Sequence, residues 1–130
     1  MITLNEVLAI HKVLIDKFGG AQGLRDNKAL DAIINRPLAT FEGKELYPNV
    51  IDKAAAVLES TLINHPFVDG NKRIGYVLMR LILMDQGFDI TATQKEKYKL
   101  VIEVAEGKQN FDDIKNWISA HLDKHVSKKQ

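Results

Sequence analysis

The segment from Ile74 to Met84 constrains the fold of this chain more than any other. It is apolar on almost every side of a helix, with Arg80 as its one charged residue. A helix without a polar face must be buried, so this segment predicts a central helix surrounded by others. About a dozen residues are too few to cross a bilayer, and we expect no membrane-spanning segment.

The composition fits one globular domain covering residues 1–130. Hydrophobic residues make up 45% and charged residues 27%, which excludes disorder over most of the chain. The absence of cysteine excludes disulfides, thiolate metal sites and cysteine nucleophiles. A net charge of +1 argues against direct nucleic-acid binding. The N-terminus has no basic start followed by an apolar run, so we expect a cytoplasmic protein.

Helical periodicity runs through most of the chain and predicts an all-α fold, a compact bundle of about six helices around the central hydrophobic one. The irregular segment from Leu38 to Pro48 is interpreted as a mobile loop or a small hairpin flap before the third helix. Arg80 is expected to reach a carboxylate or carbonyl, with Asp85 as one candidate. The predicted helices run from Thr3 to Phe18, from Asp26 to near Pro37, from Val50 to Asn64, from near Gly70 to Gln86, from Thr93 to Gly107, and from Asn110 through Leu122.

One polar segment, His65 to Arg73 (HPFVDGNKR), separates two strongly apolar predicted helices. Its second half begins the central helix, where backbone N–H groups lack intrahelical partners and, with the helix dipole, form an anion site. Gly70 lets a phosphate approach the backbone, and Asn71 can donate its amide to an oxyanion. Lys72 and Arg73 add positive charge, and arginine can bind a phosphate through two parallel hydrogen bonds.

His65 and Asp69 lie at the other end of the same loop. A neutral imidazole is the usual general base near physiological pH. A lone carboxylate beside bound phosphates is a normal way to hold Mg²⁺, with phosphate and water oxygens completing its shell. Together these groups indicate nucleotide-dependent transfer to a hydroxyl. The alternative interpretation is structural, with the polar residues capping a helix and the cations solvated, although two cations in a first turn oppose the helix dipole.

HPFVDGNKR resembles the signature of the Fic/Doc family, H-x-F-x-[D/E]-[A/G]-N-[G/K]-R, and more closely that of its Doc (death-on-curing) branch. The stretch GGAQGLRDNKALDAIINRP and the order of the predicted helices also resemble Doc-type toxins. The resemblance implies an all-α fold. The residues that meet the signature are His65, Phe67, Asp69, Asn71, Lys72 and Arg73.

The resemblance assigns roles to these residues. It implies that His65 deprotonates the target hydroxyl, that Asp69 is the Mg²⁺-linked acid, and that Phe67 anchors the loop in the core. Arg73 would bind phosphate. The anion-holding turn would comprise Gly70, Asn71 and Lys72, and the flap that docks the target would correspond to Leu38 to Pro48.

Two positions depart from the adenylyl-transferring Fic pattern G-N-G-R-x-x-R, because Lys72 replaces its second glycine and Tyr76 stands where its second arginine would be. Doc-type members share both features. In that branch the nucleotide is understood to lie reversed, so the resemblance implies phosphorylation by ATP or another nucleoside triphosphate. It further implies growth arrest by a toxin of a type II toxin–antitoxin module whose target is elongation factor Tu.

An inhibitory [S/T]-x-x-x-E-[G/N] helix of the kind found in many Fic proteins has no match here, because Leu38 and Ile102 occupy the required Ser/Thr positions. We therefore expect inhibition in trans by a Phd-like antitoxin. Adenylyl transfer (AMPylation) and a non-catalytic interaction protein with the same fold are the alternative functions.

His11 lies on an apolar helix face and is interpreted as a packed core histidine. His121 and His125 have the i, i+4 spacing of a metal chelate, but without a third ligand nearby we read this as coincidence. Arg25 and the following aspartate are interpreted as a helix cap, with antitoxin contact left open.

Overall fold

The computed structural model describes residues 2–124 as an all-α fold with six α-helices and two small antiparallel strand pairs, which confirms the predicted fold class. The expectation for His125 lies outside the described residues. The elements are α1 (Leu4–Phe18), α2 (Asn27–Asn35), the 3₁₀-helix η1 (Arg36–Leu38), β1 (Thr40–Phe41), β2 (Lys44–Glu45), α3 (Val50–Asn64), α4 (Asn71–Asp85), β3 (Phe88–Ile90), α5 (Gln94–Ala105), α6 (Phe111–His121) and β4 (Leu122–Lys124).

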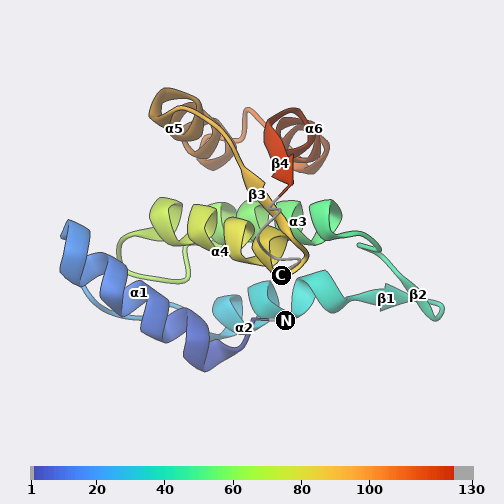
Figure 1. Ribbon diagram of the computed structural model, residues 1–130. Helices are drawn as coiled ribbons and strands as arrows, with labels where there is room; N and C mark the ends of the chain where they lie inside the picture. Colours follow the sequence, from blue (N-terminus) through green and yellow to red (C-terminus); the bar gives the residue numbers. More distant parts are fainter. Residues whose placement is uncertain (1, 125–130) are drawn as a thin grey trace.

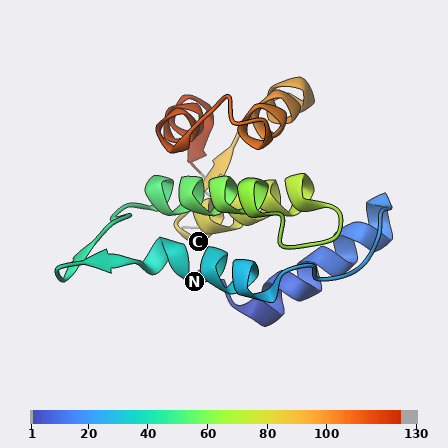
Figure 2. The same ribbon diagram turned by 180° about the vertical axis from the view of Figure 1, so that it is seen from behind.

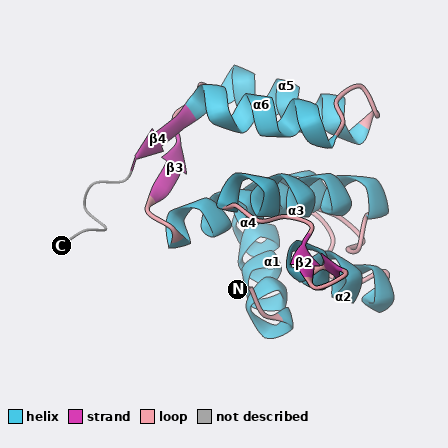
Figure 3. Cartoon of the chain, turned by 90° about the vertical axis from the view of Figure 1, so that its right-hand side faces the viewer, coloured by secondary structure: helices cyan, strands magenta, loops and turns pink. Residues whose placement is uncertain are grey.

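The helices form three layers, with α3 and α4 side by side in the middle (Figures 1 and 3). Helices α5 and α6 cover one side of this pair, and α1 and α2 cover the other, as the view from behind also shows (Figure 2). Helix α4 is therefore central, as its sequence predicts. The buried side chains of α4 are Ile74, Gly75, Leu78, Met79, Ile82 and Leu83.

The flap is an ordered hairpin rather than an irregular loop. Strands β1 and β2 pair antiparallel, and the two tip residues, Glu42 and Gly43, have φ angles of 51° and 79°. Two successive positive φ values match the twist of a two-residue hairpin turn. Of the two interpretations offered for residues 38–48, the structure supports the hairpin.

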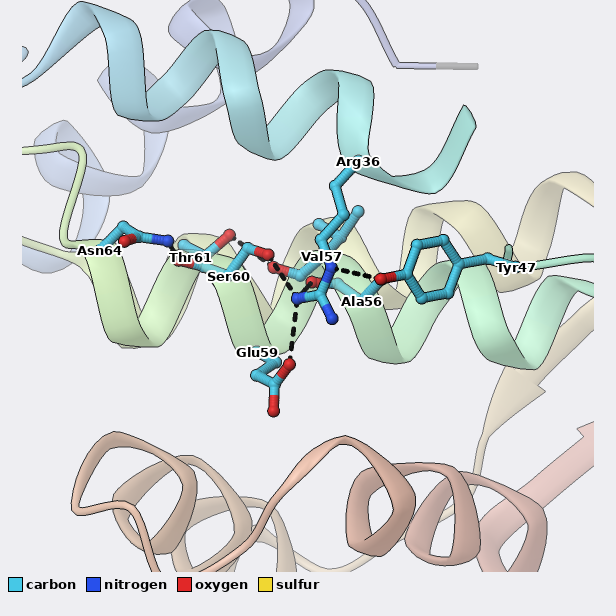
Figure 4. Close-up of polar contacts among 8 residues, drawn as sticks. All are labelled: Arg36, Tyr47, Ala56, Val57, Glu59, Ser60, Thr61 and Asn64. Carbon is cyan, nitrogen blue, oxygen red and sulfur yellow. Dashed lines mark hydrogen bonds and ion pairs between the residues drawn. The ribbon is translucent and has the colours of Figure 1, made fainter. Parts of the chain in front are cut away.

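Arg36 fixes the end of this hairpin to the bundle (Figure 4). Its guanidinium donates to the Tyr47 hydroxyl at 2.8 Å and to Ser60 Oγ at 2.7 Å, and it pairs with Glu59 at 3.0 Å. The same group lies 5.2 Å from the ring centroid of Tyr47 and 5.7 Å from that of Phe111. One arginine thus joins η1, the hairpin, α3 and α6.

Lys53 supports the same region from α3. Its ammonium donates to the Pro37 carbonyl at 3.2 Å, to the Glu45 carboxylate at 2.8 Å and to the Tyr47 carbonyl. With Arg36, it holds the chain on both sides of the hairpin, so the stem is fixed while the tip extends away from the helices (Figure 1).

Two sequence expectations are wrong. The sixth helix ends at His121, and Leu122 begins β4, which pairs antiparallel with β3. This pairing joins segments about 30 residues apart, which periodicity within a helix does not reveal. Arg80 binds Asp89 through two hydrogen bonds of 2.8 and 2.7 Å, and not Asp85. Asp85 lies five positions further along the same helix and therefore on a different face.

Within residues 2–124, no helix combines the length and the apolar character that crossing a membrane requires.

Candidate active site

The HPFVDGNKR segment forms the turn between α3 and α4. Helix α3 ends at Asn64 and is followed by His65, whose φ of 47° is left-handed; α4 begins after Gly70, whose φ is 77°. A Cβ at Gly70 would lie 3.0 Å from Ile15 Cδ1 and 3.5 Å from His11 Nε2. Conformation and space thus both require glycine where the backbone enters the central helix.

Asn71 closes this turn. Its Oδ1 accepts from the Phe67 N–H at 3.0 Å, and its Nδ2 donates to the Phe67 carbonyl at 2.9 Å. An amide nitrogen carries two hydrogens, so one remains for another acceptor. In this structure Asn71 holds the loop through these two hydrogen bonds. The anion contact that the sequence suggests would use its remaining N–H.

Phe67 anchors the loop in the core, where its side chain is 2% exposed. Its ring stacks on that of His11, with centroids 3.7 Å apart and planes 8° from parallel. His11 Nε2 lies 2.8 Å from the Asp69 carbonyl, which can only accept, so this nitrogen carries the proton. His11 is buried, as predicted, but its link to the loop joins residues 58 positions apart and has no local sequence signal.

Arg25 holds the loop from the other side. Its guanidinium donates to the Asn64 and His65 carbonyls, both at 2.6 Å, and so caps the C-terminus of α3. The Pro66 carbonyl accepts the N–H groups of Arg25 and Asp26 at 2.8 and 3.0 Å. The helix-cap interpretation is confirmed for Asp26, whose Oδ1 accepts from the Ala29 N–H at 3.0 Å at the start of α2. Arg25 caps the end of a different helix, 39 positions away, which the sequence did not indicate.

Asp69 is exposed and held by backbone donors. Its Oδ2 accepts from the Ala21 N–H at 3.1 Å and its Oδ1 from the Gly70 N–H at 2.8 Å. These two bonds, first that of Ala21, lower the pKa of the Asp69 carboxyl below its ordinary value. The ionised carboxylate keeps lone pairs free for a cation. Within residues 2–124, no three or more His or acidic side chains gather into a group that could hold a metal ion by themselves.

The N-terminus of α4 has no side-chain cap. The first intrahelical bond runs from the Ile74 N–H to the Gly70 carbonyl at 2.9 Å, so the N–H groups of Asn71, Lys72 and Arg73 precede the hydrogen-bonded part of the helix. The side chains of Lys72 and Arg73 are exposed. This turn therefore concentrates positive charge from the side chains, the N–H groups and the helix dipole.

Arg73 is positioned by an aromatic ring. Its guanidinium carbon lies 4.6 Å from the ring centroid of Phe18. The apolar periodicity of the first helix places Phe18 on the buried face, but its side chain is 54% exposed. It lies in the last turn of α1, where it supports a cation instead of packing in the core.

All the predicted site residues meet at one open cleft of about 520 Å³. His65, Asp69, Gly70, Asn71, Lys72 and Arg73 line it together. The structure thus brings together an imidazole, an ionised carboxylate and an uncapped cationic helix start. Such a site can seat a polyphosphate and can remove a proton from a group beside it.

The cleft also reaches residues that the loop motif does not contain, namely Tyr76 and Val77 of α4 and Gln94, Lys97 and Tyr98 of α5, with Val68 and Val101. The Tyr76 hydroxyl is buried and has no hydrogen-bond partner among residues 2–124. Burial raises the pKa of Tyr76 to about 12, so the phenol stays neutral.

Comparison with known proteins shows which family has this α3–α4 turn. The model of the Fic/DOC family matches residues 1–83, which include the whole α3–α4 turn. The chain belongs to the Fic/Doc family. The family likeness predicted from HPFVDGNKR is therefore confirmed, and the match covers the elements α1 to α3 and most of α4.

Two relatives place the chain near the Doc branch of the Fic/Doc family. Toxin Doc of Mycolicibacterium smegmatis is 44% identical over 75 residues, which cover 58% of each chain. Protein kinase doc of Escherichia phage P1 is 30% identical over 89 residues, which cover 68% of this chain and 70% of that protein. The chain thus spans somewhat over half of the first relative's length.

Proposed function

We propose that this chain is a toxin that transfers the terminal phosphate of a nucleoside triphosphate, such as ATP, to a hydroxyl of a target protein. The observation that carries the proposal is the uncapped, cationic start of α4, which lies beside His65 in an open cleft. The names of the two relatives, a toxin and a protein kinase, support it.

In this reaction His65 removes the proton from the target hydroxyl, whose oxygen then attacks the terminal phosphorus. The bond from that phosphorus to the bridging oxygen breaks, and the nucleoside diphosphate leaves with the electron pair. The N–H groups at the start of α4, with Lys72 and Arg73, stabilise the charge on the phosphoryl oxygens. Mg²⁺ held by Asp69 would neutralise further phosphate charge.

The same residues bear on the choice between phosphoryl and adenylyl transfer. A lysine at position 72 occupies space beside the anion turn, and Tyr76 presents a neutral ring where a second phosphate-binding arginine would stand in the adenylyl-transferring pattern. Both changes favour a site that binds one terminal phosphate tightly over one that binds a diphosphate leaving group. We therefore propose phosphoryl transfer as the reaction, with adenylyl transfer as the alternative.

The family resemblance supplies the proposed partners. The target is a translation factor, with elongation factor Tu as the first candidate, and its phosphorylation arrests growth in the cytoplasm. A Phd-like antitoxin would inhibit the chain in trans.

The test is incubation with Mg²⁺, elongation factor Tu and ATP labelled at either the γ- or the α-phosphate. We expect γ-label in the target protein and none from α-labelled ATP. Replacing His65 by alanine should lower transfer by about 10²–10⁴-fold, because a general base is lost. His121→Ala is the matched control, since His121 bonds to Trp117 and Glu96 and does not line the cleft.

Incorporation of the α-label would overturn the kinase proposal in favour of adenylyl transfer. Growth arrest by the His65→Ala variant that equals that of the unmodified chain would instead support a non-catalytic interaction protein.

A further inference from the structure

His11 of α1 touches the α3–α4 turn in two ways. Its ring stacks on that of Phe67, and its Nε2 donates to the Asp69 carbonyl at 2.8 Å. The side chain is 3% exposed and is not among the residues that line the cleft. His11 thus fixes the turn from the interior, on the side away from the reacting groups.

The hydrogen bond to His11 also orients the peptide between Asp69 and Gly70. A trans peptide is planar, and its C=O and N–H groups point in opposite directions. Because the Asp69 carbonyl points inward to His11, the Gly70 N–H points outward, where it donates to Asp69 Oδ1 at 2.8 Å. One rigid peptide unit therefore links a buried imidazole to an exposed carboxylate.

The second oxygen of this carboxylate is held from the segment that follows α1. The Ala21 N–H donates to Asp69 Oδ2 at 3.1 Å. A Cβ at Gly20 would lie 2.7 Å from the same oxygen, so glycine is needed for this close approach. The first helix and the residues after it thus position both oxygens of Asp69.

We propose that His11 is a positioning residue for the reaction, because its hydrogen bond holds the Asp69–Gly70 peptide and so aims the Asp69 carboxylate at a divalent cation. This inference rests on the proposed function, since it assigns a supporting residue to that site. Groups that orient a metal ligand contribute about 10–100-fold to metal affinity or activity. The N–H donor is the feature that acts, and the stacked ring supplies packing.

Two variants separate the hydrogen bond from the packing. His11→Phe keeps a ring to stack on Phe67 and loses the donor, whereas His11→Gln loses the ring and keeps an N–H donor. We expect His11→Phe to raise the Mg²⁺ concentration that gives half-maximal transfer of γ-label by about tenfold. His11→Gln should restore most of this loss.

A second measurement needs neither nucleotide nor Mg²⁺. The exchange of the Gly70 N–H with water can be followed by NMR in the full chain. His11→Phe should cause a loss of protection at Gly70, because the peptide is free to turn and its bond to Asp69 opens more often. His11→Gln should keep the protection.

His121→Phe is the matched control. His121 also stacks on an aromatic ring, that of Trp117, and its Nδ1 lies 2.7 Å from the Trp117 carbonyl, but it does not line the cleft. This variant should change neither the Mg²⁺ dependence nor the exchange at Gly70. Thermal unfolding will verify that each variant is folded at the assay temperature.

An Mg²⁺ dependence in His11→Phe equal to that of the unmodified chain would overturn the positioning role. Equal losses in His11→Phe and His11→Gln would also overturn it, because the donor would then make no difference. If either result appears while γ-label still enters the target, the proposed function stands without His11. If the unmodified chain transfers no label but Gly70 loses protection in His11→Phe alone, the proposed function fails and the link from His11 to Asp69 stands.

Discussion

The start of α4 differs from the starts of the other five described α-helices. Each of those five has a side-chain cap, provided by Thr3, Asp26, Asn49, Thr93 and Asn110. Four of them also carry an acidic residue in the first turn, which suits the helix dipole. Helix α4 has neither feature: it follows a left-handed glycine and carries Lys72 and Arg73 in its first turn.

This difference shows that, at the start of α4, the chain lacks a stabilising helix cap and leaves its N–H groups available to bind an anion. Caps and first-turn acids satisfy helix N–H groups within the molecule, so they leave nothing for a ligand. An uncapped cationic start costs stability in the free protein and gains it back only when an anion is present. Such departures from locally favourable choices are expected at functional sites.

The largest expected effect comes from making α4 resemble the other helices. Lys72→Glu should lower phosphoryl transfer at least about 100-fold, because an acid replaces a cation beside the transferred phosphate. The same change should raise the free energy of unfolding by about 0.5 kcal/mol, since glutamate suits the N-terminal dipole. Transfer assays with γ-labelled ATP and urea unfolding measure the two effects.

Lys28→Glu is the matched control. Lys28 occupies the second position of α2, as Lys72 does in α4, and is exposed outside the cleft. It should give a similar gain in stability with unchanged transfer. If both variants lost phosphoryl transfer equally, the difference between the starts of α4 and α2 would be unrelated to the reaction.

A smaller effect is expected from removing a cap. Asn110 Oδ1 accepts from the Asp113 N–H, and the Asp113 carboxylate accepts from the Asn110 N–H, both at 2.9 Å. Asn110→Ala should therefore lower the free energy of unfolding by about 1 kcal/mol while transfer stays unchanged below the transition. A drop in transfer at full folding would contradict the division between capped and uncapped helix starts.

The smallest effect concerns pH and compares Asp69 with Glu6. Backbone N–H donors lower the pKa of both carboxyls, from Ala21 and Gly70 for Asp69 and from Thr3 for Glu6. A depressed folded-state pKa contributes stability above the unfolded value, about 4 for either group, and that stability is lost as the pH falls through the folded pKa. Asp69→Asn and Glu6→Gln should each flatten the acid dependence of unfolding, measured with urea between about pH 2 and 6.

The two variants should separate in the transfer assay, where Asp69→Asn loses activity and Glu6→Gln keeps it. An acid dependence of unfolding that is unchanged by Asp69→Asn would show that its backbone hydrogen bonds do not persist in solution.

Much of the fold follows from local sequence rules. The predicted bounds of the third helix, Val50 to Asn64, match α3, and the caps at Thr3, Asp26, Thr93 and Asn110 are where the residue types place them. The grouping of the site residues was also predictable, because they lie within nine consecutive positions that form one turn beside one cleft.

Most of the missed features depend on contacts between different elements of the fold. His11 and Arg25 hold the loop from 58 and about 40 positions away, and neither position has a periodicity that indicates such a partner. Arg36 reads as an ordinary residue before a proline, yet it joins four elements. Local patterns report which face of a helix is buried, and they do not report which residue it meets there.

The way the β1–β2 hairpin is attached has a consequence for how such proteins can diversify. Arg36 and Lys53 bind the chain at Pro37, Glu45 and Tyr47. In the turn at residues 42–43, by contrast, a Cβ added at Gly43 would meet no other atom within 4 Å. Loop tips of this kind accept inserted or exchanged residues at little cost to folding. A homologue could therefore acquire a longer or chemically different tip while its helical scaffold stays intact.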